Sequence, residues 1–472
     1  MDRSTGNTYS VNKEQNTPGI ERRRFRPYPE YKDSGVDWLG KIPAHWVVRR
    51  LKTVASVQLS NVDKKSVEGQ ESVRLCNYVD VYYSDFISPD MDFMSATATP
   101  EQVRRFSLRA GDVLITKDSE SWTDIAVSAV VTSDLPNVLC GYHLALVRPP
   151  SRETGRFLAR AFSAIGPRDQ FQIAANGITR FGLGEDAIRS SIFGMPRIQE
   201  QRAIASFLDR ETAKIDALIE KKHRLIELLQ EKRTALITQA VTKGLDPTVP
   251  MKDSGIEWVG EIPIHWRVRR LKLLASINDE VLSEKTDPHF ELIYVDIGGV
   301  DKIEGILERE EHLFEAAPSR ARRIVRDGDV IISTVRTYLR AITPIRTPEH
   351  NLIVSTGFAV IRPKSKLSND YAAYSLRATY FVENVVANST GVSYPAIEAS
   401  KVSSFSIAVP ELMEQKQIAA FLDKETAKID EFVAGIREAI AYLKEYRMAL
   451  ISASVTGKID VREPSASAQV PY

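Results

Sequence analysis

Two stretches of the sequence gather side chains that bind phosphates and the edges of nucleic-acid bases. Arginine and lysine hold phosphates and donate to guanine, while serine, threonine and tyrosine hydroxyls supply further hydrogen bonds. The candidates are Lys117, Ser119, Tyr142 and Arg180 in the first stretch, and Arg320, Arg322, Arg336, Tyr338, Arg340, Ser355, Thr356 and Tyr394 in the second. For any single arginine a solvated or salt-bridged position is the more common alternative, so the pattern predicts a groove and leaves individual contacts open.

These candidates lie in segments whose sequence is typical of mixed helix and sheet. GDVLIT at 111–116 and GDVIIS at 328–333 are apolar runs that follow a turn, which predicts buried strands. Stretches of helical character, such as 155–165 and 369–387, intervene. Each half is therefore predicted to contain an α+β domain of roughly 160 residues.

The sequence also contains a long internal repeat. FLDRETAKID at 207–216 returns as FLDKETAKID at 421–430, with nine of ten residues identical. Upstream, KDSGVDWLGKIPAHWVVRRLK at 32–52 returns as KDSGIEWVGEIPIHWRVRRLK at 252–272, with fifteen of twenty-one identical. The segments between these matched ends differ. A repeated frame with different inserts predicts two different readers on one pseudo-two-fold scaffold, and faster drift of surface loops is the alternative.

A long helix is predicted at the end of each half. Each begins just after a proline, Pro196 or Pro410, and ends near a glycine, Gly244 or Gly457. Apolar residues recur every seven positions, which is typical of a coiled coil. The predicted core positions are Leu208, Ile215, Leu229, Leu236, Leu422, Ile429, Ile436, Leu443 and Leu450. Because a whole domain separates the two helices in sequence, we expect them to pack antiparallel.

The repeated decamer carries charges that we expect on the solvent side of the first helix. These are Asp209, Glu211, Lys214 and Asp216, with Glu211 and Lys214 three residues apart as helical neighbours are. No histidine or metal-ligand partner accompanies them, so a catalytic role is not indicated. A docking surface for another protein, present twice, is the functional interpretation. Lys222 interrupts the apolar series.

Composition and motifs indicate a recognition or scaffold protein rather than an enzyme. The 472 residues favour two to four domains, and Cys76 and Cys140, the only cysteines, suit no zinc site. The sequence has no apolar run long enough to span a membrane, and its polar N-terminus predicts no secretory signal. Phosphate-binding glycine loops and the common hydrolase motifs are absent from the sequence. The reduced cysteines favour a cytoplasmic location.

Net charge leaves a second function open. The value of +1 is far from the basic balance typical of a stand-alone nucleic-acid binder. The alternative is a coiled-coil scaffold or adaptor that does not bind DNA and whose two end domains bind proteins.

The repeated motifs resemble a known family. Each half opens with W-x-G-x-I-P-x-H-W followed by RRLK, and closes with EQ-x-x-I-A-x-F-L-D-x-E-T-A-K-I-D. This pattern, over about residues 28–460, resembles the specificity subunit of type I restriction-modification enzymes. The resemblance implies two target-recognition domains that each read half of a bipartite DNA target, separated by two helices that pack as an antiparallel coiled coil and set the spacer.

The resemblance also implies partners and domain limits. Two modification subunits would dock on the helices and bring S-adenosylmethionine for adenine methylation, and restriction subunits would use ATP and Mg; no cofactor is expected on this chain. The expected domains are a disordered tail at 1–27, recognition domains at 28–195 and 247–409, helical regions at 196–246 and 410–460, and a flexible tail at 461–472. No base-contacting residue can be transferred by motif, because these residues vary with the target.

Overall fold

The computed structural model describes residues 25–256 and 258–462, and these fall into two units. Unit 1 contains the chain up to residue 219 and again from residue 440, and unit 2 contains residues 220–439. The division therefore passes through both long helices, and each unit holds the start of one helix and the end of the other. The predicted tails lie almost entirely outside the described residues.

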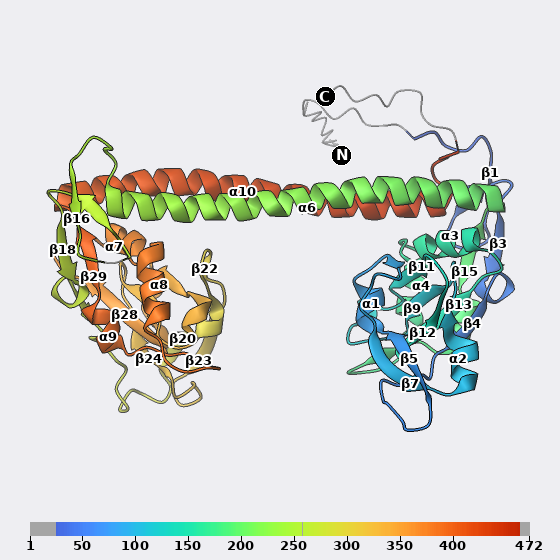
Figure 1. The fold of residues 1–472 in the computed structure, drawn as a ribbon, viewed down its shortest axis with the longest axis horizontal. Helices are drawn as coiled ribbons and strands as arrows, with labels where there is room; N and C mark the ends of the chain where they lie inside the picture. The colour runs from blue at the N-terminus through green and yellow to red at the C-terminus, as the bar shows by residue number, and fades with distance from the viewer. Residues whose placement is uncertain (1–24, 257, 463–472) are drawn as a thin grey trace, which may run out of the picture. The chain divides into compact units, whose positions relative to one another are not determined.

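Unit 1 contains one α+β domain (Figure 1). Its strands are β1 (Tyr31–Asp33), β2 (Lys41–Pro43), β3 (Val47–Arg50), β4 (Ser56–Leu59), β5 (Glu71–Cys76), β6 (Phe86–Ile87), β7 (Met94–Ala98), β8 (Ser107–Leu108), β9 (Val113–Thr116), β10 (Asp118–Ser119), β11 (Ser128–Val131), β12 (Leu135–Cys140), β13 (Leu144–Arg148), β14 (Phe181–Gly182) and β15 (Ile192–Met195). Its helices are η1 (Leu51–Thr53), α1 (Tyr78–Tyr82), α2 (Pro100–Phe106), η2 (Trp122–Asp124), α3 (Arg152–Phe162), α4 (Pro167–Ala174) and α5 (Glu185–Ser190).

Two sheets build the core of unit 1. One has the order β4-β13-β9-β11-β6 and the other the order β7-β5-β12-β8. Side chains alternate along a strand, so β9 turns Val113 and Ile115 toward the helices and Leu114 toward the second sheet. A strand buried on both faces reads as a continuous apolar run, which is why GDVLIT was recognisable in the sequence.

Unit 2 repeats this plan. Its strands are β16 (Met251–Asp253), β17 (Glu261–Pro263), β18 (Arg267–Arg270), β19 (Ala275–Ile277), β20 (Glu291–Val295), β21 (Val300–Asp301), β22 (Gly305–Ile306), β23 (Glu310–Leu313), β24 (Ala321–Ile324), β25 (Val330–Ser333), β26 (Ile342–Pro344), β27 (Leu352–Ser355), β28 (Phe358–Pro363) and β29 (Ser406–Val409). Its helices are η3 (Leu271–Leu273), η4 (Ile297–Gly299), η5 (Thr337–Leu339), α7 (Asn369–Ser375), α8 (Thr379–Ala387) and α9 (Ala399–Ser404). The sheets have the orders β19-β28-β25-β26 and β23-β20-β27-β24.

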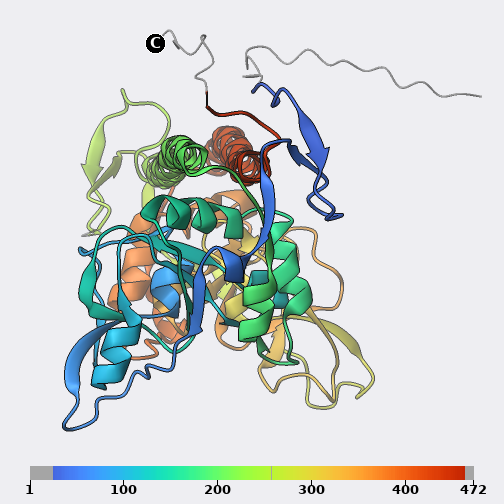
Figure 2. The same ribbon diagram turned by 90° about the vertical axis from the view of Figure 1, so that its right-hand side faces the viewer.

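The two long helices are α6 (Ile198–Lys243) and α10 (Leu412–Val455). In unit 1 the start of α6 packs with the end of α10, and Asp216 pairs with Arg447 at 2.9 Å. In unit 2 the end of α6 packs with the start of α10, and Arg233 pairs with Asp430 at 3.1 Å. Figure 2 looks along both helices and shows them side by side, with the teal helix α3 below them. The predicted antiparallel pairing and the α+β class are confirmed.

The predicted core positions differ in burial. Six of them, Leu208, Ile215, Leu422, Ile429, Ile436 and Leu450, are buried, and Leu229, Leu236 and Leu443 are half-buried. Lys222 is half-buried as well, so the interruption of the apolar series falls where the seam is less enclosed.

The matched opening segment fastens each domain to the first turns of its helix. Trp46, fully buried, donates its indole N–H to Glu200 Oε1 at 3.0 Å, and His45 Nε2 lies 2.7 Å from Glu200 Oε2. In unit 2, Trp266 makes the same bond to Glu414 at 3.0 Å, with His265 at 2.9 Å. The motif W-x-G-x-I-P-x-H-W therefore recurs because it binds the glutamate of the recurring EQ.

The decamer fastens the same domain a second time. Asp209 pairs with Arg160 at 2.9 Å and with Arg156, both on α3. Its counterpart Asp423 accepts a 2.6 Å hydrogen bond from the hydroxyl of Tyr374 on α7. The expectation that Asp209 faces solvent is wrong, because the carboxylate neutralises arginines of its own domain. The Glu211–Lys214 pair is present at 3.0 Å as predicted.

Each helix ends against the opening segment of the other repeat. In unit 1 the ammonium of Lys458 donates to the carbonyls of Leu39 and Lys41 at 3.0 and 2.6 Å. In unit 2 the ammonium of Lys243 donates to the carbonyl of Glu261 at 2.5 Å. These contacts satisfy carbonyls beside the helix ends and close each unit. Within residues 25–256 and 258–462, no helix combines the length and the apolar character needed to cross a membrane.

Candidate nucleic-acid interface

Three separate segments of unit 1 meet at one edge, which we name reading edge 1. They are the loop after β9 (117–126), the turn before β13 (141–143) and a seven-residue tongue (176–182). The N–H of Lys117 donates to His143 O at 3.1 Å, and the N–H of Leu183 donates to Lys117 O at 2.8 Å. Strand β10 then pairs with β14, with Asp118 opposite Gly182. Backbone pairing thus fixes the tongue beside the loop.

Reading edge 2 of unit 2 has the same construction. Its segments are the loop after β25 (334–341), the turn 355–357 and the tongue 390–396. The N–H of Thr334 donates to Gly357 O at 2.8 Å, and the N–H of Ile397 donates to Thr334 O at 2.8 Å. A β-bridge joins Val335 to Ala396, as Asp118 joins Gly182 in unit 1. The same three segments are thus held together by equivalent hydrogen bonds in both units.

The side chains of reading edge 1 form a mixed-charge cluster. The Lys117 ammonium lies 4.6 Å from the centre of the Tyr142 ring and 3.5 Å from Asp118. Asp118 also contacts His143 Nδ1 at 2.9 Å. The carboxylate orients the lysine and the imidazole, and it offsets part of the positive charge of the lysine. A cation over an exposed aromatic ring offers both a phosphate contact and a stacking surface.

The other two predicted residues of the first stretch lie at different depths. Arg180 lies on the tongue and is exposed. Ser119 is buried, and its hydroxyl accepts from the N–H of Ser121 at 3.2 Å. Ser119 therefore supports the loop, and its side chain offers little surface to a ligand.

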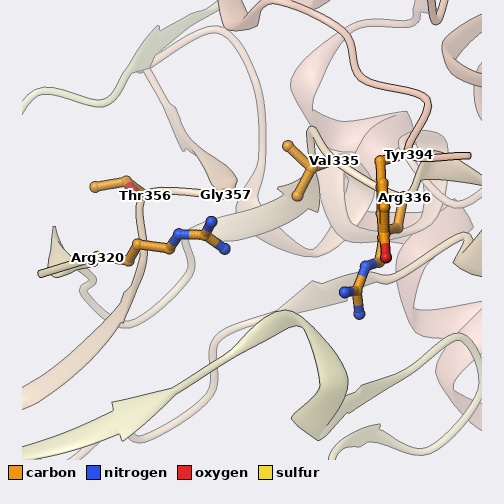
Figure 3. A pocket seen from close by; sticks show the side chains of 6 residues that line it. All are labelled: Arg320, Val335, Arg336, Thr356, Gly357 and Tyr394. Atoms are coloured by element: carbon orange, nitrogen blue, oxygen red, sulfur yellow. The ribbon is translucent and has the colours of Figure 1, made fainter. Parts of the chain in front are cut away.

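Reading edge 2 encloses a basic cavity. Its volume is about 490 Å³, and its lining comprises Arg320, Val335, Arg336, Thr356, Gly357 and Tyr394. Figure 3 shows the Arg336 guanidinium beside the Tyr394 ring and Arg320 reaching in from the opposite wall. The guanidinium carbon of Arg336 lies 5.2 Å from the ring centre, which is a cation–π contact. The structure therefore brings together four of the eight residues predicted in the second stretch.

The loop that carries Arg336 is strained. Arg336 and Arg340 have φ of 52° and 53°, in the left-handed region that non-glycine residues seldom adopt. Hydrogen bonds hold this shape, since Arg340 N–H donates to Thr337 O at 3.0 Å and the Thr337 hydroxyl donates to Ser389 at 2.8 Å. Such strain is typical of binding loops, where it fixes side chains in advance.

The remaining predicted residues of the second stretch lie near this cavity or away from it. Tyr338 is exposed on η5, and Arg340 pairs with Glu383 at 2.8 Å. Arg322 stacks on the Phe314 ring at 4.7 Å, outside the cavity lining. Ser355 is fully buried, where its oxygen accepts from Gly357 N–H at 3.3 Å. Sequence reasoning therefore found the loop residues and could not tell a lining residue from a supporting one.

Arg340 also lines a second cavity of about 530 Å³ between α6 and α8. Its most buried cation is Arg377, whose Nε donates to Ala373 O at 2.8 Å and whose guanidinium lies over the Tyr374 ring at 5.1 Å. Burial, together with the nearby charge of Arg233, lowers the pKa of Arg377 to about 10. The side chain therefore stays charged at neutral pH.

The tongues are the feature that sequence reasoning missed. Arg180 and Tyr394 are separate candidates in the sequence analysis. They lie 214 residues from each other, which is also the interval between the two decamers. Gly177 and Gly391 share that interval. Aligning the variable segments of the two halves by that interval would have paired the two tongues, although their residues differ. Within the described residues, no group of three or more histidines, cysteines, aspartates or glutamates is placed to hold a metal ion.

Comparison with known proteins gives a consistent result. A family model described as the type I restriction modification DNA specificity domain matches residues 323–442. A Methanocaldococcus jannaschii protein named as the type I restriction enzyme MjaX specificity subunit is 24% identical over 437 residues, which cover 90% of this chain and 96% of that protein. The EcoKI specificity subunit of Escherichia coli is 27% identical over 100 residues, which cover 21% of this chain and 22% of that one.

A solved structure shares the fold. One chain from a study of complex assembly and conformational transition in a type I restriction-modification system matches with a TM-score of 0.60 and 20% identity, covering 89% of this chain and 99% of that chain. The resemblance predicted from the repeated motifs is therefore confirmed: over most of its length this chain is similar to specificity subunits of type I restriction-modification enzymes.

Proposed function

We propose that this chain is the DNA sequence-recognition subunit of a type I restriction-modification complex, in which each unit reads one half of a bipartite target. The observation that carries the proposal is the pair of reading edges. The same three segments are joined by equivalent backbone hydrogen bonds, yet the side chains that line them differ. Two edges with the same backbone arrangement and different side chains suit two different half-sites.

The chemistry of the edges fits DNA. Arginine reads guanine bidentately, hydroxyls bond either base edge, and aromatic rings stack. The frame adds cations that can hold phosphates, since Arg49 and Arg50 on β3 and their counterparts Arg269 and Arg270 on β18 are exposed. Phosphate contacts fix the protein on the duplex, while the edges specify the bases. The net charge of +1 is then compatible with DNA binding if partner subunits complete a positive channel.

The helices provide the seats for partners. Leu218 on α6 and Phe432 on α10 stand at equivalent positions of the repeat, and both are exposed. An apolar side chain exposed on each helix suits docking of two modification subunits, one for each seat. Those subunits would bring S-adenosylmethionine and methylate adenine, and restriction subunits would use ATP and Mg, in the cytoplasm. The antiparallel pair would set the unspecified spacer between the half-sites.

Modification mapping tests the proposal. This chain, assembled with its modification subunits, should methylate adenine at one bipartite sequence in genomic DNA, and modification should vanish when residues 252–408 are deleted. The affinity of the assembled complex for DNA should also fall steeply with salt, because phosphate contacts release counterions. Unchanged methylation after the deletion, with a flat salt dependence, would contradict the proposal and favour the adaptor.

A further inference from the structure

We propose that the tip of each tongue places one branched aliphatic side chain against the C5 methyl group of a thymine in the major groove. The residues are Ile178 in unit 1 and Val392 in unit 2. The inference rests on the proposed function and adds to each reading edge a specificity-determining residue that the sequence alone did not suggest.

The tongue is a closed and constrained loop. In unit 1 the backbones of Asn176 and Gly182 exchange hydrogen bonds of 3.1 and 2.9 Å, and in unit 2 those of Thr390 and Ala396 exchange bonds of 2.9 Å. Gly177 has φ of +145°, and a Cβ there would lie 1.9 Å from the carbonyl oxygen of Arg180. Only glycine allows this close approach. The next residue therefore stands at the tip, held outward by the closed loop.

Exposure singles out the two tips. Ile178 is 94% exposed and Val392 is 101% exposed, the two highest values among the described large apolar side chains. The two residues occupy equivalent positions, 214 residues apart, within segments whose sequences otherwise differ. A single exposed aliphatic residue is ordinary on a protein surface. Packing does not explain why the residue at the tip of the tongue is fully exposed in both units. A ligand that covers the tip in both units accounts for it.

The surroundings of the tips identify that ligand. Beside each tip stand a hydroxyl residue, Thr179 or Ser393, and then a large planar group, Arg180 or Tyr394. Apolar contact with the thymine methyl completes the set that reads the major groove, where arginine and hydroxyl groups meet the other base edges. Branched residues suit this contact, because their restricted χ1 leaves little freedom to lose on binding.

An apolar wedge is the other use that proteins make of an exposed aliphatic residue on DNA. Wedges enter the minor groove, unstack a base step and kink the duplex. The arginine, hydroxyl and aromatic groups around the tips match the richer pattern of the major groove, so the structure favours methyl contact over a wedge. This difference can be measured.

The experiment uses the complete complex and its mapped target. Each thymine of a half-site, on either strand, is replaced in turn by deoxyuridine, which removes only the C5 methyl, and methylation rates are compared. The wild-type complex should be slowed about fourfold by deoxyuridine at one position of each half-site, as expected for one buried methyl group. Ile178→Ala should abolish that difference in the first half-site only, and Val392→Ala in the second only.

Matched controls keep the result specific. Ile173, on α4, is 86% exposed, lies outside the tongue and corresponds to Ala387 in unit 2, so Ile173→Ala should keep the wild-type response to deoxyuridine. The proposal is overturned if both tip variants keep that response, if no thymine shows one, or if 2-aminopurine placed in the half-site reports unstacking that depends on the tip. Bipartite methylation itself would survive each of these results, whereas its absence would refute the proposed function instead.

Discussion

Units 1 and 2 use the same contacts to hold their helices and different contacts to line their reading edges. Trp46 binds Glu200 as Trp266 binds Glu414, each at 3.0 Å. At the edges, Lys117 lies between Tyr142 and an acid in unit 1, whereas unit 2 sets two arginines around an open cavity without an acid in its lining. The two units therefore differ in the residues that line their edges and agree in the residues that bind the helices.

The comparison shows how one chain combines a constant frame with a variable reader. Frame residues are buried and hydrogen-bonded, so most substitutions cost stability. Edge residues are held by backbone hydrogen bonds that do not depend on side-chain identity. Their residue types can therefore change while the edge keeps its shape. The following predictions test that division, beginning with the largest effect.

Removal of a frame tryptophan should destabilise its own unit. Trp46→Ala leaves a cavity and removes the indole donor to Glu200, which then keeps only its contact with His45, so we expect a loss of about 3–5 kcal/mol in unit 1. Trp266→Ala should cost unit 2 about the same. Hydrogen exchange, read separately for the peptides of each unit, measures both losses.

Trp258→Ala is the control for the frame prediction, because Trp258 is 54% exposed. This variant should change the protection of backbone amides from hydrogen exchange little in either unit. Equal loss of protection in both units from either frame variant would show that the frame contacts do not act locally.

Substitutions at the reading edges should relax one half-site each. Arg336→Ala removes a cation from the cavity of unit 2 and should cost about 1–3 kcal/mol of discrimination at one position of one half-site. Lys117→Ala should act only on the other half-site. Methylation rates on target variants with single base changes measure both effects.

Arg322→Ala is the matched control, since Arg322 lies on the Phe314 ring outside the cavity. It should leave base preference unchanged. If the Lys117 and Arg336 variants disturbed the same half-site, the assignment of one edge to each half-site would be wrong.

Acid should weaken unit 1 through a contact whose counterpart unit 2 lacks. Asp85 bonds Arg160 at 2.6 Å and Arg447 at 2.5 Å; burial alone would raise its pKa, but these two arginines outweigh burial and lower it. In unit 2, Arg233, the counterpart of Arg447, has Arg377 near it instead.

A carboxylate with a lowered pKa contributes stability that is complete above its unfolded pKa of about 3.9 and is lost as the pH falls through the folded value. The advantage of wild type over Asp85→Asn in urea unfolding should therefore be constant near neutrality and shrink below about pH 4. Asp209 and Asp216 share the same arginines and remain in both proteins, so the difference isolates Asp85. An advantage that did not shrink at all as the pH fell below about 4 would contradict this account.

The sequence predicted the frame well and the edges poorly, for a physical reason. Long apolar heptads and a duplicated motif are local patterns, so α6, α10 and their antiparallel pairing could be predicted from the sequence. The burial of Ser355, the placement of Arg322 outside the cavity and the inward turn of Asp209 depend on how the elements pack, which no local pattern of residues records. The tongues escaped notice because backbone hydrogen bonds define them, and the only trace in the sequence is one shared glycine, Gly177 in unit 1 and Gly391 in unit 2.

The central claim, that each domain reads its own half-site independently of the frame, has a direct test in a chimera. The chain leaves and rejoins the frame at equivalent points, since Leu51 N–H donates to Ser191 O and Leu271 N–H donates to Phe405 O, both at 2.8 Å. Residues 51–191 can therefore replace residues 271–405. The transplanted Arg156 and Arg160 would meet Asp423, and the transplanted Asp85 would meet Arg233, in place of their original partners.

Mapping the modified sites of the chimera in genomic DNA is the decisive measurement. We predict a target whose two halves carry the same letters, those of the original first half-site, at the original spacing. A second half-site that kept its original letters, in a chimera that still methylates DNA, would contradict the account.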